Sequence, residues 1–174
     1  AGGGVRLVAS SSITVSEPVI ATGAGAITLE ATGGATGDIN VNNTVTSVSG
    51  AIALRADDDV LFAPGGDLTS GSGNVEVTAD ADPAQDGLVG MADGAVVNAG
   101  SGTITVSADL GIAVGQLITT NSGATAVSVT TATGDITDAG DTGGADVQAP
   151  GTATLTATAG AIGPGDALET TVGT

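Results

Sequence analysis

The chain has 174 residues and carries 19 acidic against two basic side chains, which gives a formal net charge of −17. It contains 30 glycines, one phenylalanine and no tyrosine, tryptophan, cysteine, histidine or lysine. This charge argues against nucleic acids and anionic membrane surfaces as partners, because both would repel the chain. Without His, Cys or Lys the chain cannot build the common nucleophilic triads. No apolar stretch approaches the ~20 residues of a spanning helix, so we expect no membrane span.

A motif with the pattern Gly-x-apolar-x-apolar-x-Ala recurs along the chain, and its clearest copy is residues 50–56 (GAIALRA). In chain order the copies open at Gly3, Gly25, Gly50, Gly73, Gly102, Gly123 and Gly151. The first apolar position holds Val5, Ile27, Ile52, Val75, Ile104, Thr125 and Ala153. The second holds Leu7, Leu29, Leu54, Val77, Val106, Val127 and Leu155. Apolar residues that alternate with period two predict a β-strand with one buried face.

The ends of the motif also carry information. Its last position holds Ala9, Ala31, Ala56, Ala79, Ala108, Val129 and Ala157, which suggests a narrow interior that admits little more than a methyl group. The leading glycine is typical of a corner that needs positive φ or a close approach of two backbones.

Two shorter apolar segments follow each copy of the motif. The first lies at Ile13, Ile39, Val60, Leu88, Ile112, Ile136 and Ile162, and the second near Val19, Val45, Leu68, Val97, Ile118, Val147 and Leu168. Three short strands per repeat predict an all-β fold, a parallel β-helix (solenoid) of about seven coils. Parallel crossovers are nearly always right-handed, so we expect a right-handed β-helix. The repeat runs from end to end, which predicts a single domain over residues 1–174, a rod roughly 34 Å long.

Acidic side chains gather where the first strand of a coil ends. Counting along the repeat places Asp57, Asp80 and Asp109 above one another in three consecutive coils. Stacked carboxylates repel each other, and oxygen ligands of this kind suit Ca²⁺. Two interpretations remain open, a solvated acidic edge or a Ca²⁺ site formed by Asp57, Asp58, Asp59, Asp80, Asp82, Asp86 and Asp109.

The two arginines fall at outward positions of the first strand. Arg55 stands in the column of Glu30 and diagonally to Glu76, which predicts an exposed cross-strand ion pair. Such a pair contributes at most about 1 kcal/mol, so we assign it no catalytic role.

Two further function classes depend on polar residues of the outer surface. Paired aspartates serve polysaccharide-active enzymes, but such sites normally add basic and aromatic side chains, so we expect no enzymatic activity. Outward threonines such as Thr105 and Thr154 suit an ice-binding surface, and Ala124 and Ala126 interrupt their array in the coil between.

Neither end of the chain carries an atypical repeat, and Gly173 stands five residues after Leu168, where a further copy would open. An uncapped solenoid exposes apolar columns and unpaired strand edges. We therefore expect either a segment of a longer solenoid or copies that stack head to tail into a filament. The chain begins without Met or a signal peptide, as a mature or excised segment would.

Two stretches resemble the repeats of large bacterial exoproteins of the filamentous-haemagglutinin type. They are residues 25–31 (GAITLEA) followed by 37–41 (GDINV), and residues 50–56 (GAIALRA). The resemblance covers nearly the whole chain and implies a secreted, surface-attached fibre or adhesin stalk. We therefore expect a structural protein located outside the cell, at the bacterial surface. The alternative is a calcium-stabilised solenoid that binds a surface carbohydrate.

Overall fold

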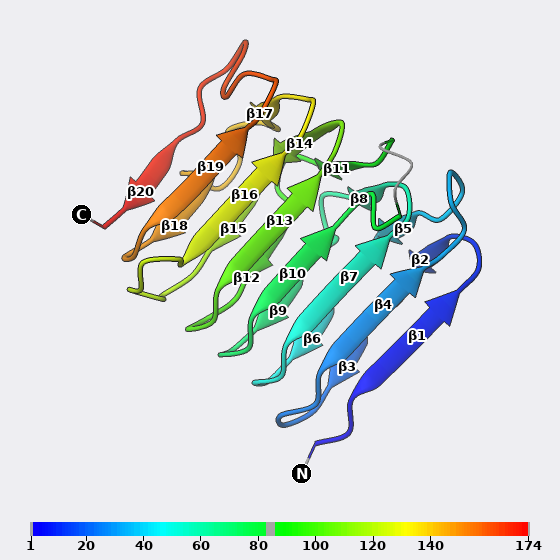
Figure 1. Ribbon diagram of the computed structural model, residues 1–174. Coiled ribbons are helices and arrows are strands. Elements are labelled where there is room, and N and C mark those ends of the chain that lie inside the picture. The colour runs from blue at the N-terminus through cyan, green and yellow to red at the C-terminus, as the bar shows by residue number, and fades with distance from the viewer. Residues whose placement is uncertain (1, 83–85, 174) are drawn as a thin grey trace.

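The computed structural model describes residues 2–82 and 86–173 and shows a solenoid of about seven coils, built from three sheets (Figure 1). Each strand pairs in parallel with the corresponding strand of the next coil, as the repeat predicts. Within the described ranges no helix is long and apolar enough to cross a bilayer.

The three sheets are named A, B and C in the order in which the chain visits them. Sheet A contains β1 (Val5–Ala9), β4 (Ile27–Ala31), β7 (Ile52–Ala56), β10 (Val75–Thr78), β13 (Ile104–Ala108), β16 (Val127–Thr131) and β19 (Ala153–Ala157). Sheet B contains β2 (Ile13–Val15), β5 (Ile39–Val41), β8 (Val60–Phe62), β11 (Leu88–Met91), β14 (Gly111–Val114) and β17 (Ile136–Asp138). Sheet C contains β3 (Val19–Ala21), β6 (Val45–Ser47), β9 (Leu68–Ser70), β12 (Val96–Asn98), β15 (Gln116–Ile118), β18 (Val147–Ala149) and β20 (Thr170–Val172).

The core consists of ladders of aliphatic side chains that point into the tube. Ile27, Ile52 and Val75 are register partners in consecutive coils, and each is at most 1% exposed. Stacked strands lie ~4.8 Å apart, so each side chain packs directly on its counterpart in the next coil. Ala31 and Ala56 are fully buried at the end of the same strands, in the column where the repeat places its alanines.

The leading glycines allow consecutive coils to approach closely at one corner. A Cβ on Gly50 would lie 2.7 Å from the backbone nitrogen of Ala26 and closer still to the carbonyl oxygen of Gly25. A Cβ on Gly73 would meet the carbonyl of Gly50 in the same way. These glycines do not have positive φ, so of the two predicted reasons the close approach is the one that applies.

Buried hydroxyl groups join neighbouring coils at this glycine corner, which the repeat pattern did not predict. Ser47 Oγ donates to the carbonyl of Gly25 at 2.7 Å and accepts from the N–H of Gly50 at 2.8 Å. One coil later Ser70 Oγ donates to the carbonyl of Gly50 at 2.9 Å and accepts from the N–H of Gly73 at 2.8 Å. Both serines are 1% exposed, so these bonds satisfy backbone groups that water cannot reach.

The sixth coil differs in register from the prediction by two residues. Val127, rather than Thr125, pairs with Ile104 and fills the first inward column. The small position is then taken by Thr131, whose hydroxyl donates to the carbonyl of Asp109 at 2.8 Å. Val127 can be buried without leaving a polar group unpaired. A buried hydroxyl needs a hydrogen-bond partner, and that of Thr131 has one.

Three further strands also differ in register from the prediction. Val89 rather than Leu88 pairs with Val60, Leu117 rather than Ile118 pairs with Val97, and Thr170 rather than Leu168 pairs with Val147. The connections that precede these strands vary in length: nine residues separate β10 from β11, and one separates β14 from β15. Spacing along the sequence therefore does not fix the register of the strand that follows.

The first and last coils continue the same columns but have a neighbour on one side only. Leu7 of β1 is 48% exposed, whereas its register partner Leu29 is 1% exposed. At the other end Leu155 of β19 is partly buried, and Val172 of β20 is 40% exposed. Both ends therefore present incomplete apolar rungs.

Candidate functional site

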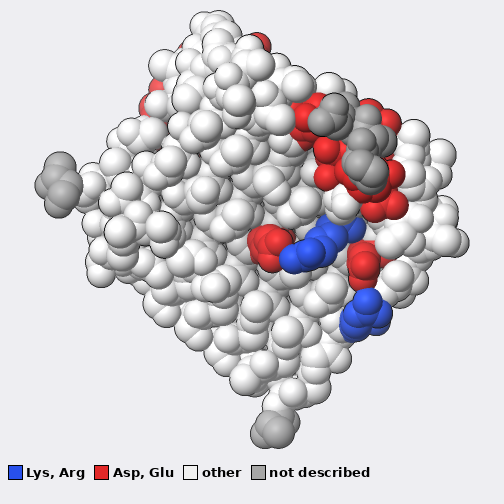
Figure 2. Space-filling view, in the orientation of Figure 1, with Lys and Arg blue, Asp and Glu red and all other residues white. Residues whose placement is uncertain are grey.

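The candidate site is the corner between sheets A and B, where carboxylates of consecutive coils gather (Figure 2). The Asp58 group consists of Asp38, Asp58 and Asp59, and each residue offers an oxygen within 4.8 Å of the other two. The Asp86 group consists of Asp80, Asp82 and Asp86 and meets the same criterion. Both groups lie in turns that lead from a strand of sheet A to a strand of sheet B.

The two groups influence each other electrostatically. Burial, followed by the charges of Asp59, Asp38 and Asp86, raises the pKa of Asp58 from 3.8 to about 6. Burial also raises the pKa of Asp59, opposed by the N–H of Leu88, which donates to its Oδ1 at 2.9 Å. The charge of Asp86 acts on both residues, so the corner behaves as one acidic region.

The expected vertical column of Asp57, Asp80 and Asp109 does not form. Asp80 has φ 60° and inserts an extra residue at the end of its strand. Ala81 therefore donates to the carbonyl of Ala56 at 2.8 Å, in the place that regular counting gave to Asp80. Counting residues cannot reveal this insertion, because it depends on a left-handed backbone conformation.

Two of the expected ligands serve the turns instead. Asp57 Oδ2 accepts from the N–H of Gly34 at 3.2 Å. Asp109 is 5% exposed, and its Oδ2 accepts from the hydroxyl of Thr133 at 3.1 Å. Of the predicted residues, the structure thus gathers Asp58, Asp59, Asp80, Asp82 and Asp86 into the two groups, and leaves Asp57 and Asp109 outside them.

Asp38 belongs to the Asp58 group although it was absent from the predicted ligand set. Asp38 and Asp59 each directly precede a strand of sheet B, and those strands are paired with Ile39 opposite Val60. An aspartate directly before the sheet B strand of a coil was therefore the sequence feature that could have identified Asp38 as a member of the group. A third group, Asp138, Asp141 and Glu169, lies in the last coils.

The remaining charges on sheet A form two ion pairs, seen beside the acidic corner in Figure 2. Arg55 contacts Glu76 at 2.8 Å, so the predicted exposed cross-strand ion pair forms, with the diagonal of the two candidate partners. Glu30 pairs with Arg6 of the first coil, also at 2.8 Å. Both pairs are substantially exposed, so they contribute little to stability.

The register of the sixth coil also changes the outward face of sheet A. The outward pairs in three consecutive coils are Thr105 with Ser107, Ser128 with Thr130, and Thr154 with Thr156. The predicted interruption by Ala124 and Ala126 is therefore wrong, because those residues precede the strand. The hydroxyl array extends over three coils without a break.

Comparison of the chain with protein-family models, curated proteins and solved structures finds no match. The solenoid shape alone does not identify a filamentous-haemagglutinin-type protein. The resemblance of the repeats to that family stays a prediction.

Proposed function

We propose that this chain is a structural segment of a bacterial surface fibre or adhesin stalk, located outside the cell and lengthened by coil-on-coil stacking. The observation that carries the proposal is the strand order of sheet A, which runs from β1 to β19 in chain order without interruption. Each strand of sheet A pairs only with the strands of the adjacent coils, so a further coil can be added without rearranging the sheet already present.

The end rungs supply a surface on which a second copy can stack. The exposed Leu7 at one end and the partly buried Leu155 at the other occupy the same inward column. Stacking the first coil of one copy on the last coil of another covers both residues and pairs the free strand edges. Such a contact joins two different surfaces and does not close on itself, so it produces a filament.

The carbohydrate-binding alternative has less support from the side chains. Small-ligand sites are usually lined by aromatic and apolar residues. The one aromatic residue of this chain, Phe62, is 4% exposed and packs in the core. A structural role needs no such site.

Sedimentation velocity and negative-stain microscopy of the full chain test the proposal. We expect thin rods whose mean length grows with protein concentration. Leu7→Lys places a charge on the end rung and should leave single particles. Leu61→Lys is the matched control, because Leu61 is 36% exposed on the lateral face of β8. A wild-type chain that remains monomeric at its highest soluble concentration, or filaments that persist in Leu7→Lys, would contradict head-to-tail stacking.

A further inference from the structure

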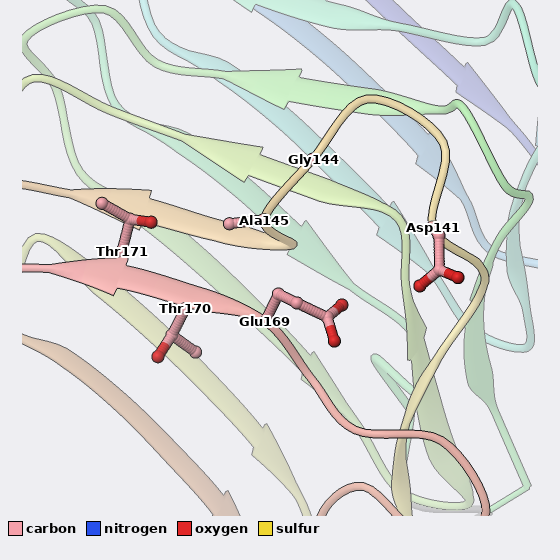
Figure 3. A pocket seen from close by; sticks show the side chains of 6 residues that line it. All are labelled: Asp141, Gly144, Ala145, Glu169, Thr170 and Thr171. Carbon is pink, nitrogen blue, oxygen red and sulfur yellow. The ribbon is translucent and has the colours of Figure 1, made fainter.

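A pocket lies where the loop between β17 and β18 approaches the start of β20 (Figure 3). Its volume is about 520 Å³, and Asp141, Gly144, Ala145, Glu169, Thr170 and Thr171 line it. In Figure 3 the carboxylates of Asp141, on the loop, and Glu169, beside β20, project into the gap between these two segments. The pocket is thus formed by residues from two successive coils.

Three carboxylates converge beside this pocket. Asp138, Asp141 and Glu169 each place an oxygen within 4.8 Å of the others. Ca²⁺ binds oxygens at 2.3–2.6 Å, so two ligands on opposite sides of the ion are about 4.6–5.2 Å apart. The three oxygens therefore fit around a single ion of this size. Acidic groups with such spacing are common on surfaces, so a second observation is needed.

That second observation is a pair of buried oxygens without hydrogen-bond donors. Asp146 is 0% exposed, and its Oδ2 accepts from the N–H of Glu169 at 2.9 Å. Its Oδ1 is buried and has no hydrogen-bond partner among the described residues. Asp138 is similar. Its Oδ1 accepts from the N–H of Gly140 at 2.6 Å, whereas its buried Oδ2 has no hydrogen-bond partner within residues 2–82 and 86–173. Leaving buried carboxylate oxygens without a donor or a cation is costly.

The charges of the three carboxylates affect the pKa of Asp146. Burial, followed by the charges of Asp138, Glu169 and Asp141, raises the pKa of Asp146 to about 6, against the effect of the Glu169 N–H. The chain has two arginines, and both are paired with glutamates within the first four coils, away from Asp146. A bound cation would therefore supply the positive charge that the side chains around Asp146 do not.

The loop is held in place by contacts outside the acidic group. Thr142 donates to Asp93 twice, from its N–H at 3.0 Å and from its hydroxyl at 2.7 Å. Gln116 Nε2 donates to the carbonyl of Gly143 at 2.8 Å. The ligands on this loop are thus positioned before any ion arrives, which lowers the entropic cost of binding.

We propose that a divalent cation of the Ca²⁺ type binds beside this pocket, with Asp138, Asp141 and Glu169 as carboxylate ligands. Asp146 stands behind them, bonded to the Glu169 N–H, as a buried carboxylate whose charge the ion offsets. Water completes the coordination shell, which for Ca²⁺ holds 6–8 oxygens. Mg²⁺ requires near-ideal octahedral geometry and gives up its water reluctantly, so a carboxylate set shared between two coils favours the more adaptable Ca²⁺. The ion ties the loop between β17 and β18 to β20, a strand with one neighbour, and so fastens the last coil.

Calorimetric titration of the full chain with CaCl₂ tests the proposal, in physiological salt and with Mg²⁺ in excess over Ca²⁺. The chain has no Trp or Tyr, so calorimetry replaces intrinsic fluorescence. We expect one Ca²⁺ site in the wild-type chain, weakened at least about tenfold in Asp141→Asn/Glu169→Gln through the loss of two ligand charges. The matched control, Glu17→Gln/Glu30→Gln, removes the same charge in the first two coils and should bind like the wild type.

A second variant tests the role of the buried Asp146 carboxylate. Asp146→Asn keeps the size of the side chain and removes its charge, so the metal-free protein should melt no lower than the wild type while its Ca²⁺ affinity falls. Absence of Ca²⁺ binding by the wild type would overturn the proposal, as would an equal loss of affinity in the Glu17/Glu30 control. Binding that survives in Asp141→Asn/Glu169→Gln but disappears in Asp58→Asn/Asp59→Asn would place the ion in the other acidic region and also overturn it. Unchanged affinity in Asp146→Asn would overturn the charge compensation proposed for Asp146.

Discussion

Substituting Gly50 by alanine tests the close stacking of coils more directly than any core truncation. The new Cβ would lie 2.7 Å from the Ala26 nitrogen and closer still to the Gly25 carbonyl oxygen. Both neighbours are backbone atoms of the preceding coil, so neither can move aside without disturbing its own strand pairing. The clash can be relieved only if two coils separate locally.

The size of the effect follows from this geometry. Overpacking of a folded interior typically destabilises a protein by 1–3 kcal/mol. Because the neighbours of the new Cβ are rigid backbone atoms, we expect Gly50→Ala to lower the free energy of unfolding by about 3 kcal/mol. For a chain of 150–250 residues each kcal/mol lowers Tm by about 2–4 °C, so we expect a drop of about 6–12 °C. Helix or strand propensity plays little part, because Gly50 lies in a turn.

The assay is thermal and guanidinium unfolding followed by far-UV circular dichroism. Gly65→Ala is the matched control, since a Cβ at Gly65 would meet nothing within 4 Å and its φ is not positive. That variant should be neutral or gain up to about 1 kcal/mol, because alanine restricts the unfolded chain. Equal stability of the Gly50→Ala and Gly65→Ala proteins would refute the close stacking described here.

Three further predictions concern the core and its polar groups. Ser47→Ala leaves the Gly50 N–H and the Gly25 carbonyl without their side-chain partner, so guanidinium unfolding should show a loss of about 1–3 kcal/mol. Leu54→Ala opens a cavity in the middle of the tube and should cost about 2–5 kcal/mol in the same assay; a loss below 1 kcal/mol would mean that Leu54 is not packed between rungs. In chelator, the free energy of unfolding should fall as pH rises from about 4 to about 6. The folded protein binds more protons than the unfolded chain in that range, because the pKa values of Asp58 and Asp146 are raised to about 6 from 3.8. Asp146→Asn should flatten this decline, and stability that rises with pH over the same range would contradict the assigned shifts.

The repeat pattern was sufficient to predict the architecture but not the length of every turn. Period-two alternation around Ile52 and Leu54 can be satisfied by one buried face only, and stacking follows because each coil alone cannot cover its apolar residues. The prediction failed at Thr125 and Leu88, where turns of irregular length precede the strand. The spacing of apolar residues within a strand carries no information about how many residues the turn before it contains.

The acidic groups show the same limit more sharply. Asp58 and Asp59 could be found as neighbours in the sequence, whereas Asp38 joins them through the register of β5 with β8. Glu169 joins Asp141 only because β20 pairs with β18 two residues later than the spacing suggested. A site shared between coils thus depends on the exact register, and an error of one or two residues is enough to lose it.

Distances between spin labels on the outward face of sheet A test the parallel, in-register stack most directly. Thr28, Ala53, Glu76, Thr105, Ser128 and Thr154 occupy one outward column in consecutive coils. The chain has no cysteine, so pairs of introduced cysteines can be labelled uniquely. Thr28→Cys/Thr154→Cys spans five steps and should give a narrow distribution near 24 Å, and Thr28→Cys/Thr105→Cys spans three steps and should give one near 14 Å, at about 4.8 Å per step. Distances that do not increase in proportion to the number of coils would contradict the stack on which the whole account depends.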